Sequence, residues 1–125
     1  MADSFAVVFD TLTGVLRRHV ELLTVQADTV SEYTLHTRTP SPFPQHKGKP
    51  MFFAQVRKGK AYVSFHLMPL YMNEKLSATV SPELKKRMQG KTCFNFKSGP
   101  DPELLRELER LTEAGLACFA ERKWL

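Results

Sequence analysis

The sequence predicts an α+β fold, a two-layer sandwich in which an antiparallel sheet carries the N-terminal and C-terminal helices on one face. Two amphipathic stretches with helical spacing stand near the two ends of the chain, at residues 4–27 and 104–119. Between them, short segments alternate in polarity as strands do. The predicted order is helix, strand, hairpin, short helix, strand and helix. Two amphipathic helices suffice to cover one face of such a sheet, so the second face is left for function.

Length and composition indicate a single globular domain over residues 1–125. A chain of this length buries about two-thirds of the surface that it exposes when unfolded. Its 42% apolar and 25% charged residues are ordinary for a globular domain. No apolar run approaches the roughly 20 residues of a bilayer span, and no signal peptide is evident. Cys93 and Cys118 are too few for a disulfide framework, so we expect a cytoplasmic protein with reduced thiols and no membrane contact.

The first helix and the first strand follow from spacing and residue type. Apolar residues recur at helical spacing over residues 4–27, at Phe5, Val8, Leu12, Leu16, Val20 and Leu23. Gly14, in the middle of that stretch, weakens a helix relative to alanine. Residues 32–38 alternate and contain Tyr33, Thr34 and Thr37, which favour a strand. The four prolines of residues 39–50 predict a loop.

The hairpin over residues 51–66 follows from its polarity pattern. A two-residue turn at Lys58 and Gly59, with Gly59 at positive φ, pairs the two strands so that apolar and polar residues separate. One face then holds Phe52, Ala54, Val56, Ala61, Val63 and Phe65. The other holds Phe53, Gln55, Arg57, Lys60, Tyr62 and Ser64. Lys58 is not a favoured turn residue, so a longer loop containing Gly59 is the alternative.

The second half of the chain completes the fold. Residues 68–80 contain Pro69 and Asn73 and predict an irregular or briefly helical connection. Ser81 and Pro82 begin a short helix that Gly90 ends. Residues 92–97 alternate as a strand, with Phe94 and Phe96 on one face and Cys93, Asn95 and Lys97 on the other. The final helix opens at Asp101-Pro102-Glu103. The predicted core is Phe52, Val56, Val63, Phe65, Phe94, Leu108 and Leu111.

Three segments carry a resemblance to a known family. The hairpin, the Gly90-Lys91-Thr92-Cys93-Phe94-Asn95-Phe96-Lys97 strand and the closing helix after Pro100-Asp101-Pro102 resemble the YdhG-like small α/β domains, over residues 50–120. The resemblance implies a frataxin-like fold. It also implies iron as a ligand, because one bacterial member is described as a frataxin-like iron chaperone. Frataxins bind iron through acidic residues, whereas the acidic residues of the first helical region, Asp3, Asp10, Glu21 and Asp28, are dispersed.

Charge and aromatic residues concentrate in the middle of the chain. Residues 36–97 hold twelve Lys and Arg against two Glu, and eight of the thirteen aromatic residues. This asymmetry indicates an anionic partner, either a small ligand or a nucleic acid, although a solvated surface or a homodimer contact are the alternatives. The candidate ligand-binding residues lie on the exposed sheet face: Phe53, Gln55, Arg57, Tyr62, Ser64, His66 and Asn95.

Catalytic and metal-binding motifs are absent from the sequence. No HxH, HExxH or CxxC spacing unites His19, His36, His46, His66 and Cys93 into a metal site. His46 is expected to face solvent. Cys93 and His66 share a sheet face by parity, but no third residue is apparent to orient a thiol–imidazole pair. No Walker loop or GxGxxG occurs. We therefore expect a non-enzymatic binding domain without a cofactor. The alternatives are an iron-binding protein and, third, a weak nucleic-acid binder.

Overall fold

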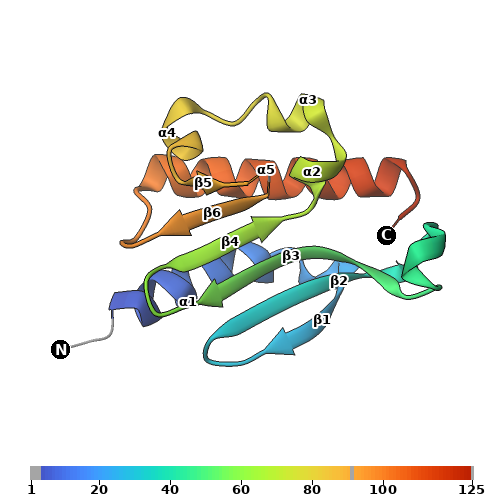
Figure 1. The fold of residues 1–125 in the computed structure, drawn as a ribbon, viewed down its shortest axis with the longest axis horizontal. Helices are drawn as coiled ribbons and strands as arrows, with labels where there is room; N and C mark the ends of the chain where they lie inside the picture. The colour runs from blue at the N-terminus through green and yellow to red at the C-terminus, as the bar shows by residue number, and fades with distance from the viewer. Residues whose placement is uncertain (1–3, 91, 125) are drawn as a thin grey trace.

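The computed structural model describes residues 4–90 and 92–124, so Asp3 and Lys91 lie outside the described part. Six strands form one antiparallel sheet in the order β1-β2-β3-β4-β6-β5 (Figure 1). The strands are β1 (Leu23–Asp28), β2 (Glu32–Pro40), β3 (Pro50–Lys58), β4 (Val63–Leu67), β5 (Met88–Gln89) and β6 (Cys93–Phe96). The helices are α1 (Ser4–Arg17), α2 (Pro69–Met72), α3 (Glu74–Ser77), α4 (Pro82–Lys85) and α5 (Pro102–Glu121), with 3₁₀ turns at Val20–Leu22 and Pro44–His46.

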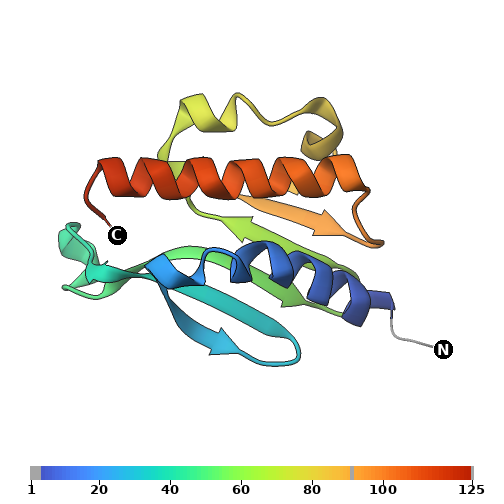
Figure 2. The same cartoon turned by 180° about the vertical axis from the view of Figure 1, so that it is seen from behind.

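The two long helices pack side by side on one face of the sheet, which confirms the predicted α+β class (Figure 2). Helix α1 buries Val8, Leu12 and Leu16 on its apolar stripe. Helix α5 begins where the Asp101 side chain accepts a hydrogen bond from the Leu104 backbone N–H at 2.9 Å, as a capping aspartate does. Its buried stripe is Leu104, Leu108, Leu111, Thr112, Gly115, Leu116 and Phe119.

Strands β1 and β5 lie where the sequence pattern predicted the ends of two helices. Residues 23–27, predicted as the end of the first helix, belong to the edge strand β1 (Leu23–Asp28), which pairs with β2 through Leu23 and Thr37. The helical spacing of Leu23 is misleading because the 3₁₀ turn before it reorients the chain, and Leu23 is buried as a strand residue. Gly90, at φ +78°, turns the chain between β5 and β6 and does not end the short helix, which stops at Lys85.

The β3–β4 hairpin has a longer loop than the predicted two-residue turn. Ala54 pairs with Leu67 and Lys58 with Val63, so residues 59–62 form the loop. The Gly59 backbone N–H donates to the Tyr62 carbonyl at 3.0 Å, and Gly59 does not adopt a left-handed φ. The tight-turn prediction is therefore wrong and the longer-loop alternative is confirmed. Since the pairing shifts by an even number of residues, each β4 side chain keeps its predicted face.

A β-bulge in β3 exchanges the roles of two adjacent phenylalanines. Leu35 pairs with Ala54 and His36 with Phe52, so Phe53 is an extra residue on β3. The extra residue turns Phe53 into the core, where it is fully buried and its ring meets that of Phe119 edge-on at 5.4 Å. Phe52 is half-buried on the other face. Phe53 is thus wrong as a binding residue and Phe52 as a core residue. The other predicted core residues are confirmed: Val56, Val63, Phe65, Phe94, Leu108 and Leu111.

We predict opposite effects for alanine at the two helical glycines. A Cβ at Gly115 would lie 2.7 Å from Cγ of Pro69, so Gly115→Ala should destabilise the protein by about 1–3 kcal/mol. A Cβ at Gly14 meets nothing within 4 Å, so Gly14→Ala should stabilise it by about 0.5–1 kcal/mol. Urea unfolding of both variants measures this. Shifts in the same direction would contradict the close approach of α5 to α2.

The bulge predicts a large difference between the two neighbouring phenylalanines. Phe53→Ala removes a fully buried ring and should reduce the free energy of unfolding by about 3–5 kcal/mol. Phe52→Ala removes a half-buried ring, so the loss should be about 1 kcal/mol. Thermal or urea unfolding compares the two variants. A larger loss for Phe52→Ala would indicate a regular strand without the bulge.

Candidate functional site

The second face of the sheet carries the candidate site. Figure 1 looks onto this face, and no helix crosses in front of strands β1 to β4. Strand pairing sets Gln55 beside His66, Arg57 beside Ser64, Ser64 beside Asn95, and His66 beside Cys93. Of the predicted site residues, Gln55, Arg57, Ser64, His66 and Asn95 therefore share this face. Tyr62 lies in the β3–β4 loop at its edge, and Phe53 lies in the core.

Hydrogen bonds between side chains hold the β4–β6 part of this face. The Asn95 Oδ1 atom accepts from the Ser64 hydroxyl at 3.0 Å and from the Cys93 thiol at 3.2 Å. The Asn95 amide donates to Oε1 of Gln89 at 2.8 Å. Asn95 therefore links β4, β5 and β6, and both the Ser64 hydroxyl and the Cys93 thiol donate to it. On β2 and β3, Gln55 likewise donates to the Thr34 hydroxyl at 3.0 Å.

Cys93 and His66 meet as the strand parity predicts, with Sγ and Nε2 3.5 Å apart. Burial, and then the nearby Arg57 guanidinium, lower the pKa of His66 below its ordinary value. Burial raises the pKa of the Cys93 thiol, and the neighbouring Ser64 hydroxyl opposes that change to a smaller extent. Both groups are therefore uncharged at neutral pH. Asn95 contacts the thiol and not the imidazole, so this pair lacks the thiolate and the oriented base of a cysteine nucleophile.

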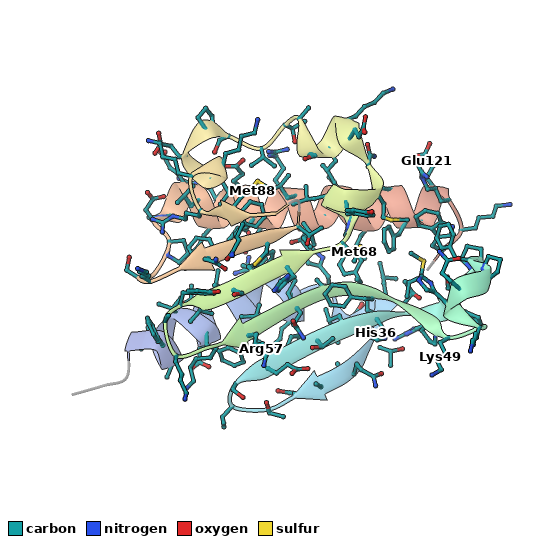
Figure 3. All side chains as sticks on the ribbon, in the orientation of Figure 1. His36, Lys49, Arg57, Met68, Met88 and Glu121 are labelled. Atoms are coloured by element: carbon teal, nitrogen blue, oxygen red, sulfur yellow. The ribbon has the colours of Figure 1, made fainter. Side chains whose placement is uncertain are left out.

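A pocket of about 840 Å³ opens over these residues. Ser64, His66 and Cys93 line it from β4 and β6, Gln89 lines it from β5, and the β3–β4 loop forms another wall. Figure 3 labels Arg57 on β3 and Met88 on β5, the strands that bound the pocket. Its lining includes three cationic side chains and, among the described residues, no carboxylate. The cations are Arg57, Lys58 and Lys60, and the remaining lining residues are Gly59, Ala61 and Tyr62.

A second pocket, of about 500 Å³, is mainly apolar and was not predicted. Its lining comes from four separate segments, which is why no local pattern reveals it: Phe43, Gln45, His46, Met51, Phe52, Met68, Tyr71, Met72 and Thr92. His46 was expected to face solvent, but its ring is half-buried. It lies 2.6 Å from the Ser41 hydroxyl and edge-on to Phe43.

The residues present do not fit an iron site. Within residues 4–90 and 92–124, no three His, Cys, Asp or Glu side chains come together to hold a metal ion. The Cys93–His66 pair supplies only two such donors, and the neighbouring cations repel a divalent metal. None of the helices in the described part of the chain has the length and hydropathy of a bilayer span.

Comparison of the chain with protein-family models, with curated proteins and with solved structures yields no match. The geometry and chemistry of this face therefore have to indicate what the protein does. Its β3–β4–β6 part combines a basic pocket, a set of hydrogen-bonded polar side chains and an uncharged thiol–imidazole pair.

The Cys93 thiol should react slowly with alkylating agents. Because its pKa is raised and the side chain is half-buried, iodoacetamide at about pH 7.5 should modify it about tenfold or more slowly than a short cysteine peptide. The measurement uses Cys118→Ser, in which Cys93 is the remaining thiol. Urea should restore the peptide rate. Modification of the folded protein at or above that rate would instead indicate an activated thiolate.

Proposed function

We propose that this protein is a non-enzymatic binding domain that recognises an anionic partner on the open face of its sheet. The observation that carries the proposal is the basic pocket, where three cations and several neutral hydrogen-bonding groups converge and no carboxylate is among the described lining residues. Cations gathered in a concave site attract anions more strongly than the same charges dispersed over a surface.

The availability of two of these cations supports the proposal. Arg57 and Lys60 form no salt bridge within the described part of the chain. An arginine guanidinium presents a planar set of donors that matches the oxygens of a phosphate or carboxylate, while a lysine supplies a mobile point charge. An anion in the pocket would reduce the mutual repulsion of these cations.

The geometry favours a compact anionic ligand over a nucleic acid. Single-stranded nucleic acids stack successive bases on exposed aromatic rings along a basic groove. The predicted aromatic platform loses Phe53 to the core, which leaves Tyr62 as the aromatic residue at the pocket. The three cations of this pocket lie at the loop end of the face. The middle of the face carries the neutral Thr34, Gln55 and Asn95, and the Glu32 carboxylate, which is the cross-strand partner of Arg57, accepts from the Thr34 hydroxyl.

Membership of the YdhG-like family and a frataxin-like fold remain proposals. They are supported by the order of the elements and by the two long helices on one sheet face. A cytoplasmic location is proposed from the two free cysteines. Self-association through the open face is the competing use of the same surface, and sedimentation at several protein concentrations distinguishes it from ligand binding.

Charge removal in the pocket should weaken polyanion binding. We expect the double variant Arg57→Gln/Lys60→Gln to bind a heparin fragment with about tenfold lower affinity. Its affinity should also decrease less than that of the unsubstituted protein when the salt concentration rises from about 50 mM to about 200 mM. The matched control is Lys75→Gln with Arg106→Gln, which removes the same charge from exposed positions on α3 and α5. Fluorescence anisotropy of labelled heparin measures both. An equal loss in the control would attribute binding to overall net charge and contradict the pocket.

A further inference from the structure

The pocket has the size and charge of a site for a small dianion. Its volume of about 840 Å³ lies within the roughly 300–1,000 Å³ that small-molecule sites occupy. Arg57 and Lys60 together supply two positive charges without salt-bridge partners in the described chain. A phosphate monoester carries between about −1.5 and −2 charges at neutral pH and therefore balances this pair, whereas a single carboxylate does not.

The hydrogen bonds at the pocket assign the proton of His66. Since the Cys93 thiol donates to Asn95, its sulfur is left to accept from His66, which places the proton of the neutral imidazole on Nε2. The other ring nitrogen, Nδ1, then carries a lone pair. In neutral His66, Nδ1 is therefore a hydrogen-bond acceptor, and an anionic oxygen, which is also an acceptor, cannot bond to it. A second proton on the ring converts Nδ1 into a donor.

The described groups that line the pocket with His66 are cationic or neutral in the absence of a ligand, and the Glu32 carboxylate on β2, the cross-strand partner of Arg57, is not among them. Arg57 on β3 and burial disfavour the imidazolium, so the pKa of His66 is lowered. An anion bound next to the ring reverses that electrostatic balance and favours the imidazolium. The titratable and charged groups that line the pocket with His66 are Arg57, Lys58, Lys60 and Tyr62 from β3 and its loop, and Cys93 from β6.

On the basis of the function proposed above, we propose that this pocket binds a small phosphate-bearing molecule and that His66 takes up a proton from solvent as it binds. Arg57 and Lys60 compensate the ligand's charge, and the amide N–H groups of Gln89, whose Oε1 is occupied by Asn95, supply neutral donors. The phosphate keeps its covalent structure, so binding changes only the protonation of the protein.

Sulfate is the first test ligand, because it keeps two negative charges across the pH range in which phosphate titrates. Any pH dependence of sulfate binding therefore comes from the protein and not from the ligand. We expect the affinity for sulfate to be about tenfold higher near pH 5.5 than near pH 7.5. Amide chemical shifts should move at Tyr62, Ser64 and His66. Calorimetry in two buffers of different ionisation enthalpy should register the uptake of a proton. Inorganic phosphate, glycerol 3-phosphate and AMP then distinguish a free ion, a simple monoester and a nucleotide.

Two histidine variants test the coupling. His66→Gln should retain sulfate binding at a level that no longer depends on pH. The matched control is His36→Gln, because His36 is also half-buried with a pKa lowered by burial, and it lies on the same face outside this pocket. His36→Gln should keep the full pH dependence. Arg57→Gln should weaken sulfate binding about tenfold or more at both pH values.

Each negative outcome identifies what is wrong. Heparin binding that depends on Arg57 and Lys60, without binding of sulfate or any of the phosphates, would overturn the small-ligand inference and leave the proposed function intact. Full pH dependence in His66→Gln would overturn the proton coupling. If substitution of Arg57 and Lys60 changes the binding of neither heparin nor the small anions, the proposed function itself is wrong.

Discussion

Both long helices of this protein lie on the same face of the sheet, and most other features depend on that packing. Helices α1 and α5 together cover the inner face, where Leu12, Phe65 and Leu108 are fully buried. Within residues 4–90 and 92–124, no long helix remains for the second face. That face therefore has to be stable in contact with water, and it achieves this with side chains that bond to one another across strands, as Asn95 does with Ser64 and Gln89.

The bulge in β3 connects this packing to the loop at one end of the sheet. By turning Phe53 inward, it starts a series of edge-on ring contacts that continues through Phe119 and Trp124 to Phe43, with centroid distances of 5.4, 5.2 and 5.5 Å. Aromatic pairs in this geometry contribute beyond their buried area. The proline-rich loop between β2 and β3 is thereby tied to the end of α5, and the same bulge leaves Phe52 beside the apolar pocket.

At the other end of the sheet, charge and burial act in opposite directions. The end of β3 and the β3–β4 loop bring Arg57, Lys58 and Lys60 around one pocket, which favours an anion. In the same pocket, burial favours the uncharged forms of Cys93 and His66. This combination is poor for nucleophilic catalysis, since neither member of the pair carries the required charge at neutral pH. It suits a binding site whose histidine becomes charged when a compensating anion arrives.

Local periodicity determined much of this protein from its sequence alone: the α+β class, the closing helix, the hairpin and the shared face of Gln55, Ser64, His66 and Asn95. These follow because alternation and helical spacing are properties of a few consecutive residues. The inward turn of Phe53, the strand at residues 23–28 and the four-residue hairpin loop were decided by tertiary structure. Each depends on a contact outside its own segment: the buried ring on Phe119, which is distant in sequence, the edge strand on its pairing with β2, and the loop length on the register with β4. The pocket is of the same kind. Arg57 and Gln89 come from segments far apart in the chain, and only the sheet order brings them to one site.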